Sequence, residues 1–577
     1  MLGLCVRTAW RFYARLWTFF FLILVGVSGC HSDTPLPVGQ GTPIGQGTSR
    51  YAGFSVMGPD WQVAEVFANE AERLAYLEKQ GYLMAQHTSR LHGNMVRVPI
   101  YMWTVLGSGL PSVTASTGKP LYQIDADTVA ATIEKISIFL QASLAGMGKD
   151  QDATGQPLRW QQWDALLAGI QKYNTELAAD PANTHPAVLV TIVLTSFPPA
   201  EIIESPNGEE VRELYQETHI RFARKLVQRY GHGYARDGAS ALFPIVAAIE
   251  MINEPDYMWL PDELKIEKAL NPDAYPCDKY ITQLHLSQVP ENDSPGKGCA
   301  RKDGFYREQP LPVPAIETPL KDFRWGSKFD VYVKFFAQLH EHVSFAAKDE
   351  ISRGGADMVV VSAAVTHVNT DWFVRMFRAN PETFRYVDKI AIHPYHWPRH
   401  DIHDMTFVDA QSRRNWLTLN PRVFAREYFK RFDFIRELAT LVAEPDWEKS
   451  YGLSGKAVWV TEFGIPTKKL GKANASIPRH WKIFIYDRAS GIPDGVGAIV
   501  WEDKWEAFFE QVPATFLHTN HVEAFLIYTL RESLGNETND DNHSNFSLYT
   551  SDWSGRLAPP TLKRLSEFFQ SFRGADA

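Results

Sequence analysis

Short apolar segments alternate with longer amphipathic segments through most of this 577-residue chain, from Tyr51 to Phe572. The apolar segments are rich in β-branched residues, as in Ala-Val-Leu-Val-Thr-Ile-Val-Leu-Thr at 187–195. Such continuous apolar runs are typical of strands that are buried on both faces. Strands that are separated by helices pair in parallel, because each helix returns the chain to the same edge of the sheet. The alternation therefore predicts an α/β fold with a parallel sheet.

The apolar pattern predicts eight strands, at 51–57, 94–100, 187–195, 243–252, 357–364, 389–393, 456–462 and 496–501. The amphipathic pattern predicts helices at 63–86, 128–144, 160–177, 208–230, 328–348 and 560–572. Eight strands with interleaved helices predict a (β/α)8 barrel, the TIM-barrel fold, with large insertions in its βα loops. No sequence repeat of about 20–50 residues is visible, which argues against a solenoid or a propeller.

The composition agrees with one large globular domain and excludes one class of partner. Apolar residues make up 45% of the chain, which supports a large core. The formal net charge is -9, and no block of basic residues is present. Because nucleic-acid binding requires clustered positive charge, the sequence predicts no nucleic-acid partner.

The first thirty residues predict a targeting segment rather than a folded element. Three arginines precede an apolar stretch at 16–27 that is short for a membrane span: Arg7, Arg11 and Arg15. The following Val27-Ser28-Gly29-Cys30 resembles a bacterial lipobox. This resemblance implies a signal peptide at 1–29, lipidation of Cys30, and export to a membrane-anchored position facing the periplasm or the cell surface. An uncleaved membrane anchor is the alternative.

Two further segments lack helical or strand periodicity. Residues 30–50 are rich in Gly, Pro, Ser and Thr and predict a flexible tether to the barrel domain at 51–577. Residues 256–326 are rich in Pro, Asp and Lys and predict a loop inserted after the fourth strand. This loop contains Cys277 and Cys299, which we expect to form a disulfide in an exported protein.

Two of the predicted strands end in a glutamate. The fourth strand runs into Asn253-Glu254-Pro255, where proline ends the pairing because it has no N–H to donate. The seventh strand ends in Thr461-Glu462-Phe463-Gly464. Because a TIM barrel carries its functional residues at the C-terminal ends of its strands, we expect Glu254 and Glu462 to face each other.

These two motifs, at the ends of strands four and seven, resemble those of clan A of the retaining glycoside hydrolases, and the likeness in strand order extends over 51–572. The resemblance implies that Glu254 is the general acid/base and Glu462 the nucleophile. Retention requires two carboxyl groups about 5 Å apart, one protonated and one ionised. The implied reaction is hydrolysis of O-glycosidic bonds in a β-linked oligo- or polysaccharide, through a covalent glycosyl-enzyme intermediate and without a cofactor or metal.

The resemblance also implies roles for five supporting residues. Arg97, in Val-Arg-Val-Pro on strand two, would keep the nucleophile ionised. Asn253 would bind the 2-hydroxyl of the sugar. His393 would lie near the acid/base, and Tyr395 would contact the nucleophile. Trp501, at the end of the predicted eighth strand, would form a platform under the reacting sugar.

One further expectation comes from strand periodicity. Glu250 lies two residues before Ile252 on the fourth strand, and we expect it to point into the barrel and pair with Arg97.

Other functions share these residues. A non-catalytic carbohydrate-binding lipoprotein could keep the same barrel, and a transglycosylase in exopolysaccharide processing could use the same two glutamates. Sugar identity and endo or exo action stay open.

A metal site is a further alternative, suggested by a cluster of histidines and aspartates: His393, His396, His400, Asp401, His403 and Asp404. These residues belong to one loop, whereas metal ligands in barrels usually come from several strand ends, so the sequence does not predict a metal.

Overall fold

Eight parallel strands close into a ring in the computed structural model of the chain. In order around the ring they are β1 (Tyr51–Ser55), β2 (Met95–Tyr101), β3 (Leu189–Thr195), β6 (Val246–Glu250), β7 (Val359–Val361), β9 (Lys389–His393), β10 (Ala457–Phe463) and β11 (Val522–Tyr528). The ring closes because β11 pairs with β10 on one side and with β1 on the other. The predicted (β/α)8 barrel is therefore confirmed.

The structure describes residues 50–56, 67–117, 119, 121–205, 208–255, 327–366, 370–394, 455–464, 505, 508–509, 512–519, 521–531, 547–549, 552–555 and 557–574. The predicted signal peptide at 1–29, the tether except Arg50, and the insertion at 256–326 lie outside these residues.

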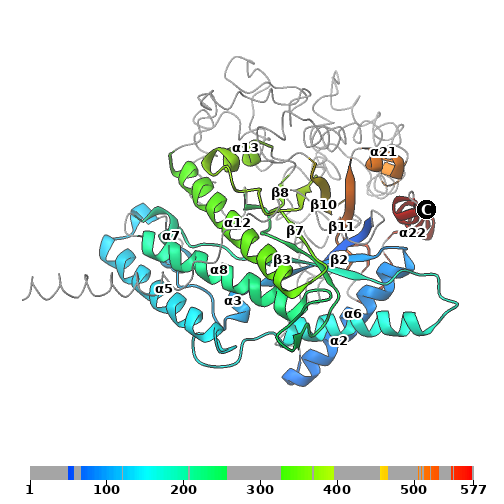
Figure 1. Ribbon diagram of the computed structural model, residues 1–577, viewed down its shortest axis with the longest axis horizontal. Helices are drawn as coiled ribbons and strands as arrows, with labels where there is room; N and C mark the ends of the chain where they lie inside the picture. The colour runs from blue at the N-terminus through cyan, green and yellow to red at the C-terminus, as the bar shows by residue number, and fades with distance from the viewer. Residues whose placement is uncertain are drawn as a thin grey trace, which may run out of the picture. The chain divides into compact units, whose positions relative to one another are not determined.

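Long helices cover the outside of the barrel. They are α2 (Glu70–Arg90), α5 (Ala126–Met147), α6 (Gln161–Ala179), α8 (Glu209–Tyr230), α12 (Ser327–Gly354), α13 (Thr370–Ala379) and α22 (Pro559–Gly574). Helices α5, α8 and α12 lie side by side, and so do α2 and α6 (Figure 1). The predicted helices are therefore confirmed, with shifts at their ends.

Short elements occupy the connections: α3 (Met102–Val105), α4 (Val113–Thr117), η3 (Leu121–Gln123), α7 (Ala200–Glu204), β4 (Ala235–Arg236), β5 (Ala239–Ser240), β8 (Val365–Thr366) and α21 (Ala514–Thr519).

Helices α2 and α6 pack closely because each carries a glycine at the contact. A Cβ on Gly81 would lie 1.9 Å from the carbonyl oxygen of Leu166. A Cβ on Gly169 would lie 1.9 Å from the carbonyl oxygen of Glu78. Any larger side chain at these two positions would push the helices apart. The first turns of these two helices also border a pocket of about 740 Å³.

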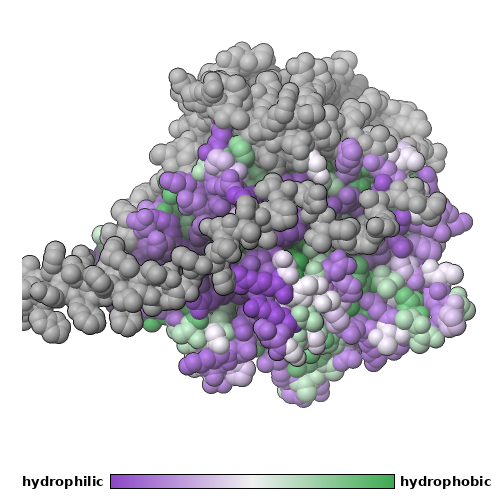
Figure 2. Space-filling view, viewed as in Figure 1, coloured by the Kyte–Doolittle hydropathy of each residue, from purple (hydrophilic) through white to green (hydrophobic). Residues whose placement is uncertain are grey.

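The outer surface of the helices is mixed in character. Figure 2 shows mostly hydrophilic residues on the described surface in this view, with hydrophobic residues in smaller groups between them. Among the described helices, α5 alone is long and apolar enough to cross a membrane by length and composition, and it packs against α8.

The inside of the barrel is filled mostly by small and aliphatic residues around one tryptophan. The ring of Trp459 lies 5.3 Å from that of Tyr51. Their neighbours in this buried cluster include Met95, Ala248 and Ala391, one from each of three further strands. A second, larger cluster fills the space between the strands and the helices. Both faces of each barrel strand are thus buried, which explains the continuous apolar runs in the sequence.

The prediction of the eighth strand was wrong. The place between β10 and β1 is taken by β11, Val522–Tyr528, and residues 496–501 lie outside the described part of the chain. Both segments are short apolar runs, which local periodicity cannot rank. Glu523 also interrupts the run in β11, where it forms an ion pair of 2.5 Å with Lys389. Pairing with both neighbours identifies the true strand.

Candidate active site

Charged side chains replace apolar ones at the C-terminal ends of the barrel strands. Along β2, Met95 belongs to the interior cluster, and Arg97 follows two residues later on the same face. Along β6, Ala248 and Glu250 are related in the same way. His393 ends β9 in a fully buried position. The strand periodicity that builds the apolar interior therefore also points these polar residues toward the barrel axis.

Arg97 is the centre of this polar cluster. Its Nε and Nη2 donate to the two carboxylate oxygens of Glu250 at 2.8 and 2.6 Å, which confirms the expected pair. Nη2 also donates to Oδ1 of Asn253 at 2.6 Å. Nη1 donates to Oγ of Ser55 at 3.1 Å and to Oε1 of Glu462. One buried guanidinium thus holds residues from the ends of three other strands, β1, β6 and β10, in place.

The positive charge of Arg97 is stabilised by the carboxylates of Glu250 and Glu462. Burial by itself would lower the pKa of Arg97, but the carboxylates of Glu250 and Glu462 raise it above its ordinary value. The side chain is 2% exposed, so a neutral partner would leave a buried charge uncompensated. Arg97 therefore keeps its positive charge inside the barrel.

Glu254, His393 and Glu462 form the second part of the site. One oxygen from each carboxylate and one ring nitrogen of His393 all lie within 4.8 Å of one another. Nδ1 of His393 is 2.7 Å from Oε1 of Glu254 and 3.7 Å from Oε2 of Glu462. The structure therefore brings together two glutamates that are far apart in sequence, as the barrel prediction requires.

His393 is fixed on both sides of its ring. Its Nε2 lies 3.1 Å from Oγ1 of Thr461, opposite the nitrogen that faces Glu254. Burial lowers the pKa of His393, but the charge of Glu462 and the hydrogen bond with Glu254 outweigh burial, so that its pKa is raised. The imidazole is therefore held in one orientation between the two carboxyl groups.

The backbone is irregular at both Glu254 and Glu462, and this irregularity sets the direction of their side chains. The pairing of β10 with β11 shifts register between Val460 and Phe463, the segment that contains Glu462. Such an irregularity turns a side chain away from the regular alternation of a strand. Glu254 has a φ of 41°, which is uncommon for a residue with a Cβ and often marks a functional position.

Sequence reasoning missed three residues at this site. Ser55 ends β1, and its hydroxyl is 3.4 Å from Oε1 of Glu462. Tyr101 ends β2, and burial together with the charge of Glu462 raises its pKa. Tyr528 ends β11 and pairs in register with Ser55. The signal for Tyr101 was present, because it lies four residues after Arg97 and so shares its strand face.

Two predicted site residues and several other predictions lie outside the described residues. They are Tyr395 and Trp501, the cysteines Cys30, Cys277 and Cys299, and the loop residues His396, His400, Asp401, His403 and Asp404. The eighth strand ends in Tyr528 rather than in Trp501.

The Glu254, His393 and Glu462 set also has the residue types of a metal site. Two features of the described residues oppose a cation there. Arg97 already contacts Glu462, and its positive charge repels a cation at that carboxylate. Both ring nitrogens of His393 already have partners, since Nδ1 lies 2.7 Å from Oε1 of Glu254 and Nε2 lies 3.1 Å from Oγ1 of Thr461. The arrangement suits proton transfer and nucleophilic attack better than metal binding.

Comparison with known proteins gave no sequence relative and several structural ones. No protein-family model and no curated protein matches the chain. Solved structures that resemble it include an exo-beta-1,4-mannosidase from Opitutaceae bacterium strain TAV5, with 9% identity and a TM-score of 0.38. A glucosidase from Croceicoccus marinus has 10% identity and a TM-score of 0.38. A beta-galactosidase from Marinomonas ef1 has 11% identity and a TM-score of 0.35.

The structural alignments cover 91% of this chain for the mannosidase, 93% for the glucosidase and 90% for the galactosidase. The same alignments cover 60% of the mannosidase chain, 70% of the glucosidase chain and 59% of the galactosidase chain. The chain thus spans less than two thirds of the length of two of these proteins.

Proposed function

We propose that the protein is a retaining glycoside hydrolase that acts on a β-linked oligo- or polysaccharide. The observation that carries this proposal is the approach of Glu254 and Glu462: one carboxylate oxygen of each lies within 4.8 Å of the other at the C-terminal edge of the barrel. A retaining mechanism requires carboxyl groups roughly 5 Å apart, whereas an inverting mechanism needs about 6.5–9.5 Å to admit a water molecule. The separation favours retention.

In the first step, an oxygen of Glu462 attacks the anomeric carbon while the bond to the leaving oxygen breaks. Glu254 donates its proton to that leaving oxygen. Arg97 holds Glu462 as an anion, and Ser55 hydrogen-bonds the same carboxylate oxygen. A covalent glycosyl ester on Glu462 results.

In the second step, Glu254, now ionised, takes a proton from water as the water oxygen attacks the anomeric carbon. The ester bond breaks, and Glu462 leaves as a carboxylate, so the anomeric configuration is retained. His393 positions Glu254 through the contact of 2.7 Å and supplies a donor to the carboxylate when it is ionised. Asn253 binds Arg97 through its amide oxygen, which directs its amide nitrogen away from Arg97 and makes it the donor for a sugar hydroxyl.

A mechanism-based inhibitor tests the proposal directly. The full chain is treated with a panel of activated 2-deoxy-2-fluoro β-glycosides, and the labelled peptide is located by mass spectrometry. We expect the label on Glu462 and none in Glu462→Gln. Glu382→Gln, at an exposed glutamate far along the chain, is the matched control and keeps the label. A label on another residue contradicts the proposed nucleophile.

Two alternatives have separate readouts. A carbohydrate-binding protein without catalysis would bind glycans but release no aryl aglycone from aryl β-glycosides. A transglycosylase would use the same two glutamates and yield products longer than its substrate, which the product masses reveal. The proximity of the two carboxylates favours catalysis, because a binding site gains nothing from two like charges placed side by side.

We also propose that the enzyme is exported and anchored to a membrane through a lipid on Cys30, with residues 30–50 as its tether. The supporting feature is the lipobox-like Val27-Ser28-Gly29-Cys30 after a basic and apolar segment. Labelling of cells with a palmitate analogue tests this proposal. We expect incorporation into the wild-type chain and none into Cys30→Ser, and a soluble unlabelled wild type would contradict it.

A further inference from the structure

The inward-facing side of β3 ends in an aromatic residue. Side chains of a strand alternate between its two faces, here the barrel interior and the surrounding helices. Thr191 points inward, since its Oγ1 lies 3.0 Å from Sδ of Met95 in the interior cluster. Ser196 points outward, since its Oγ lies 2.5 Å from Nε2 of His219 on α8. By the same alternation Phe197, two residues beyond the end of β3, faces the mouth of the barrel.

Phe197 is the exposed residue of a buried segment. It is 37% exposed, whereas Ser196 before it and Pro198 after it are both buried. It belongs to neither of the two apolar clusters that fill the barrel and its surroundings. The other large apolar side chains that are exposed among the described residues lie on α5, on α12 or in the connection before β6. Within this set, Phe197 is the residue that directly follows a barrel strand, on the edge where TIM barrels bind substrate.

The backbone is restrained on both sides of Phe197. Burial lowers the pKa of His219 to about 4, so its ring is neutral near pH 7. Its Nδ1 lies 2.8 Å from the carbonyl oxygen of Tyr215, which only accepts, so Nε2 accepts a hydrogen bond from Ser196. On the other side, Pro198 confines Phe197 to extended conformations. The ring is therefore preorganised, which lowers the entropy cost of binding a ligand.

The helix that follows Phe197 is fixed as well. Glu201 of α7 is fully buried, and its Oε1 accepts hydrogen bonds from the backbone N–H groups of Val113 and Thr114 at 2.7 and 2.9 Å. These two bonds join α7 to the connection after β2. The segment that carries Phe197 is thus anchored to α8 at one end and to this connection at the other.

The strand order places Phe197 beside the proposed acid. Val193 of β3 pairs in register with Glu250 of β6. Phe197 and Glu254 each lie four residues beyond this pair, at the ends of neighbouring strands. The strand of Glu462, β10, is four strands away from β3 in either direction around the ring. Phe197 is therefore next to Glu254 and across the barrel from the proposed nucleophile.

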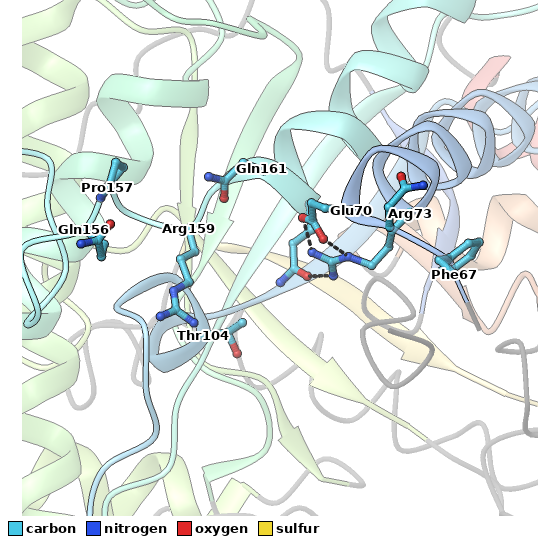
Figure 3. Close-up of a pocket in the computed structure, with 10 residues that line it drawn as sticks. Phe67, Glu70, Arg73, Thr104, Gln156, Pro157, Arg159 and Gln161 are labelled. Atoms are coloured by element: carbon cyan, nitrogen blue, oxygen red, sulfur yellow. Dashed lines mark hydrogen bonds and ion pairs between the residues drawn. The ribbon is translucent and has the colours of Figure 1, made fainter. Parts of the chain in front are cut away.

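The pocket beside α2 and α6 contains another aromatic ring, but its side chains are engaged with one another. Figure 3 shows Phe67 at one end of this pocket, with Arg73 bonded to Glu70 next to it. Nε of Arg73 donates to Glu70 at 2.7 Å. The ring of Phe67 packs against that of Tyr76, with 5.0 Å between the ring centres. The ring of Phe197 makes no such contact with an aromatic ring of the described residues, so its face is available to a ligand.

We propose that Phe197 is the platform for the leaving sugar, the unit that is released when the glycosidic bond is cleaved. The inference rests on the proposed function, because it takes Glu254 as the acid that protonates the leaving oxygen. The leaving sugar then lies on the side of Glu254, where Phe197 presents its ring. The C–H face of a pyranose packs on such an apolar surface. Phe197 would thus determine which leaving groups are accepted, and it would favour a sugar over a small group.

Pairs of substrates that differ only in the leaving group test this proposal. The full chain is assayed with cellobiose and β-glucosyl fluoride, with 4-β-mannobiose and β-mannosyl fluoride, and with 4-β-galactobiose and β-galactosyl fluoride. In Phe197→Ala, kcat/KM for the disaccharide that the wild type cleaves should fall about tenfold, because the stacking surface is lost. For the matching fluoride it should change less than about twofold, since fluoride is too small to pack on the ring.

Two further variants serve as controls. Phe197→Tyr keeps the aromatic face and should retain most of the activity on the disaccharide. Phe345→Ala removes a phenylalanine of nearly equal exposure, 36%, on α12 and should behave as the wild type. Thermal melts establish that Phe197→Ala is folded. Equal losses on disaccharide and fluoride would overturn the proposal, because Phe197 would then act on the transferred sugar. Unchanged kcat/KM on both substrates would also overturn it.

A binding measurement separates this inference from the proposed function. The same disaccharides are titrated into Glu462→Gln, with and without Phe197→Ala, and followed by NMR of the ligand. The double variant should bind about tenfold more weakly. If the wild type cleaves none of the substrates but binding shows this loss, the proposed reaction fails and Phe197 stays a sugar platform. If the wild type cleaves a pair and the double variant binds as well as Glu462→Gln, the platform fails and the proposed function stands.

Discussion

Arg97 and Glu250 form a two-bond ion pair inside the barrel, with Nε and Nη2 of the arginine 2.8 and 2.6 Å from the two carboxylate oxygens. Both side chains are buried. The pair fixes the plane of the guanidinium, so that its remaining donors point at Asn253, Ser55 and Glu462. Glu250 therefore contributes to the site by orienting Arg97 and needs no contact with substrate.

Replacing Glu250 with glutamine should destabilise the protein strongly. Removing the charge of Glu250 leaves the buried Arg97 with Glu462 as its remaining ion-pair partner, and the expected loss in the free energy of unfolding is about 3 kcal/mol. Urea denaturation measures it. The matched control is Glu382→Gln, which breaks an exposed ion pair of 2.6 Å with Arg385 and should leave stability almost unchanged. Equal effects of the two substitutions would show that the buried pair has no special role.

Glu254→Gln should reduce activity in a manner that depends on the leaving group. Loss of a general acid typically lowers the rate by about 10²–10⁴ when the leaving group needs a proton. Dinitrophenolate leaves without a proton, so dinitrophenyl glycosides should lose much less rate. The measurement is kcat/KM of the wild type and of Glu254→Gln for a series of aryl glycosides whose leaving groups differ in pKa. A uniform loss across the series is inconsistent with Glu254 as the acid.

Ser55→Ala should slow the reaction without preventing folding. The hydroxyl accepts a hydrogen bond from Arg97 and lies 3.4 Å from Oε1 of Glu462. Its loss should cost about 1 kcal/mol, equivalent to a fewfold decrease in kcat, with KM little changed. Ser116→Ala, on an exposed helix, is the control and should retain wild-type kinetics. A change confined to KM would mean that Ser55 contacts the substrate instead of aligning Glu462.

Chelation should leave the activity unchanged. Arg97 contacts Glu462, and both ring nitrogens of His393 already face Glu254 and Thr461, so the three candidate ligands are poorly suited to a cation. Rates measured before and after dialysis against EDTA should agree. Loss of activity with EDTA and its recovery on adding a divalent metal would replace the carboxylate mechanism by a metal-dependent one.

His340 should make the protein less stable in acid. This buried histidine of α12 contacts the carbonyl oxygen of Thr383 through Nδ1 at 2.7 Å, and its Nε2 accepts a hydrogen bond from the N–H of Ala363 at 3.1 Å. Burial lowers its pKa to about 4. Below the ordinary pKa of a histidine, about 6.5, the unfolded chain takes up a proton that the folded chain excludes down to about 4. Stability is therefore lost as the pH falls through this window.

Urea denaturation at pH 7 and pH 5 measures the effect. One such histidine should account for a loss of about 2 kcal/mol between these two pH values. His219, whose pKa is also lowered to about 4 by burial, adds to the total in the wild type. His340→Gln should therefore be less stable at pH 7 but lose less stability on acidification. An identical loss in wild type and variant would show that His340 does not exclude the proton.

Local patterns were sufficient for most of the fold. Seven of the eight strands were predicted near their observed positions, because a strand buried on both faces needs an apolar run that is visible within a few residues. The same alternation placed Glu250 on an inward face, where we expected it to pair with Arg97, and the structure confirms this pair. The prediction of the eighth strand was wrong because two apolar runs, 496–501 and 522–528, fit the local pattern equally well. Only the closure of the ring distinguishes them.

The sequence by itself determined the parallel barrel and the positions of Glu254 and Glu462 at two strand ends, because both depend on short segments of chain. Only the tertiary structure decided which groups surround them. Ser55 and Glu462 are 407 residues apart in sequence, yet they share Arg97. The pocket near Gln162 likewise combines residues from three helices and two loops. Such contacts follow from closure of the ring and the packing of helices around it, which no local periodicity encodes.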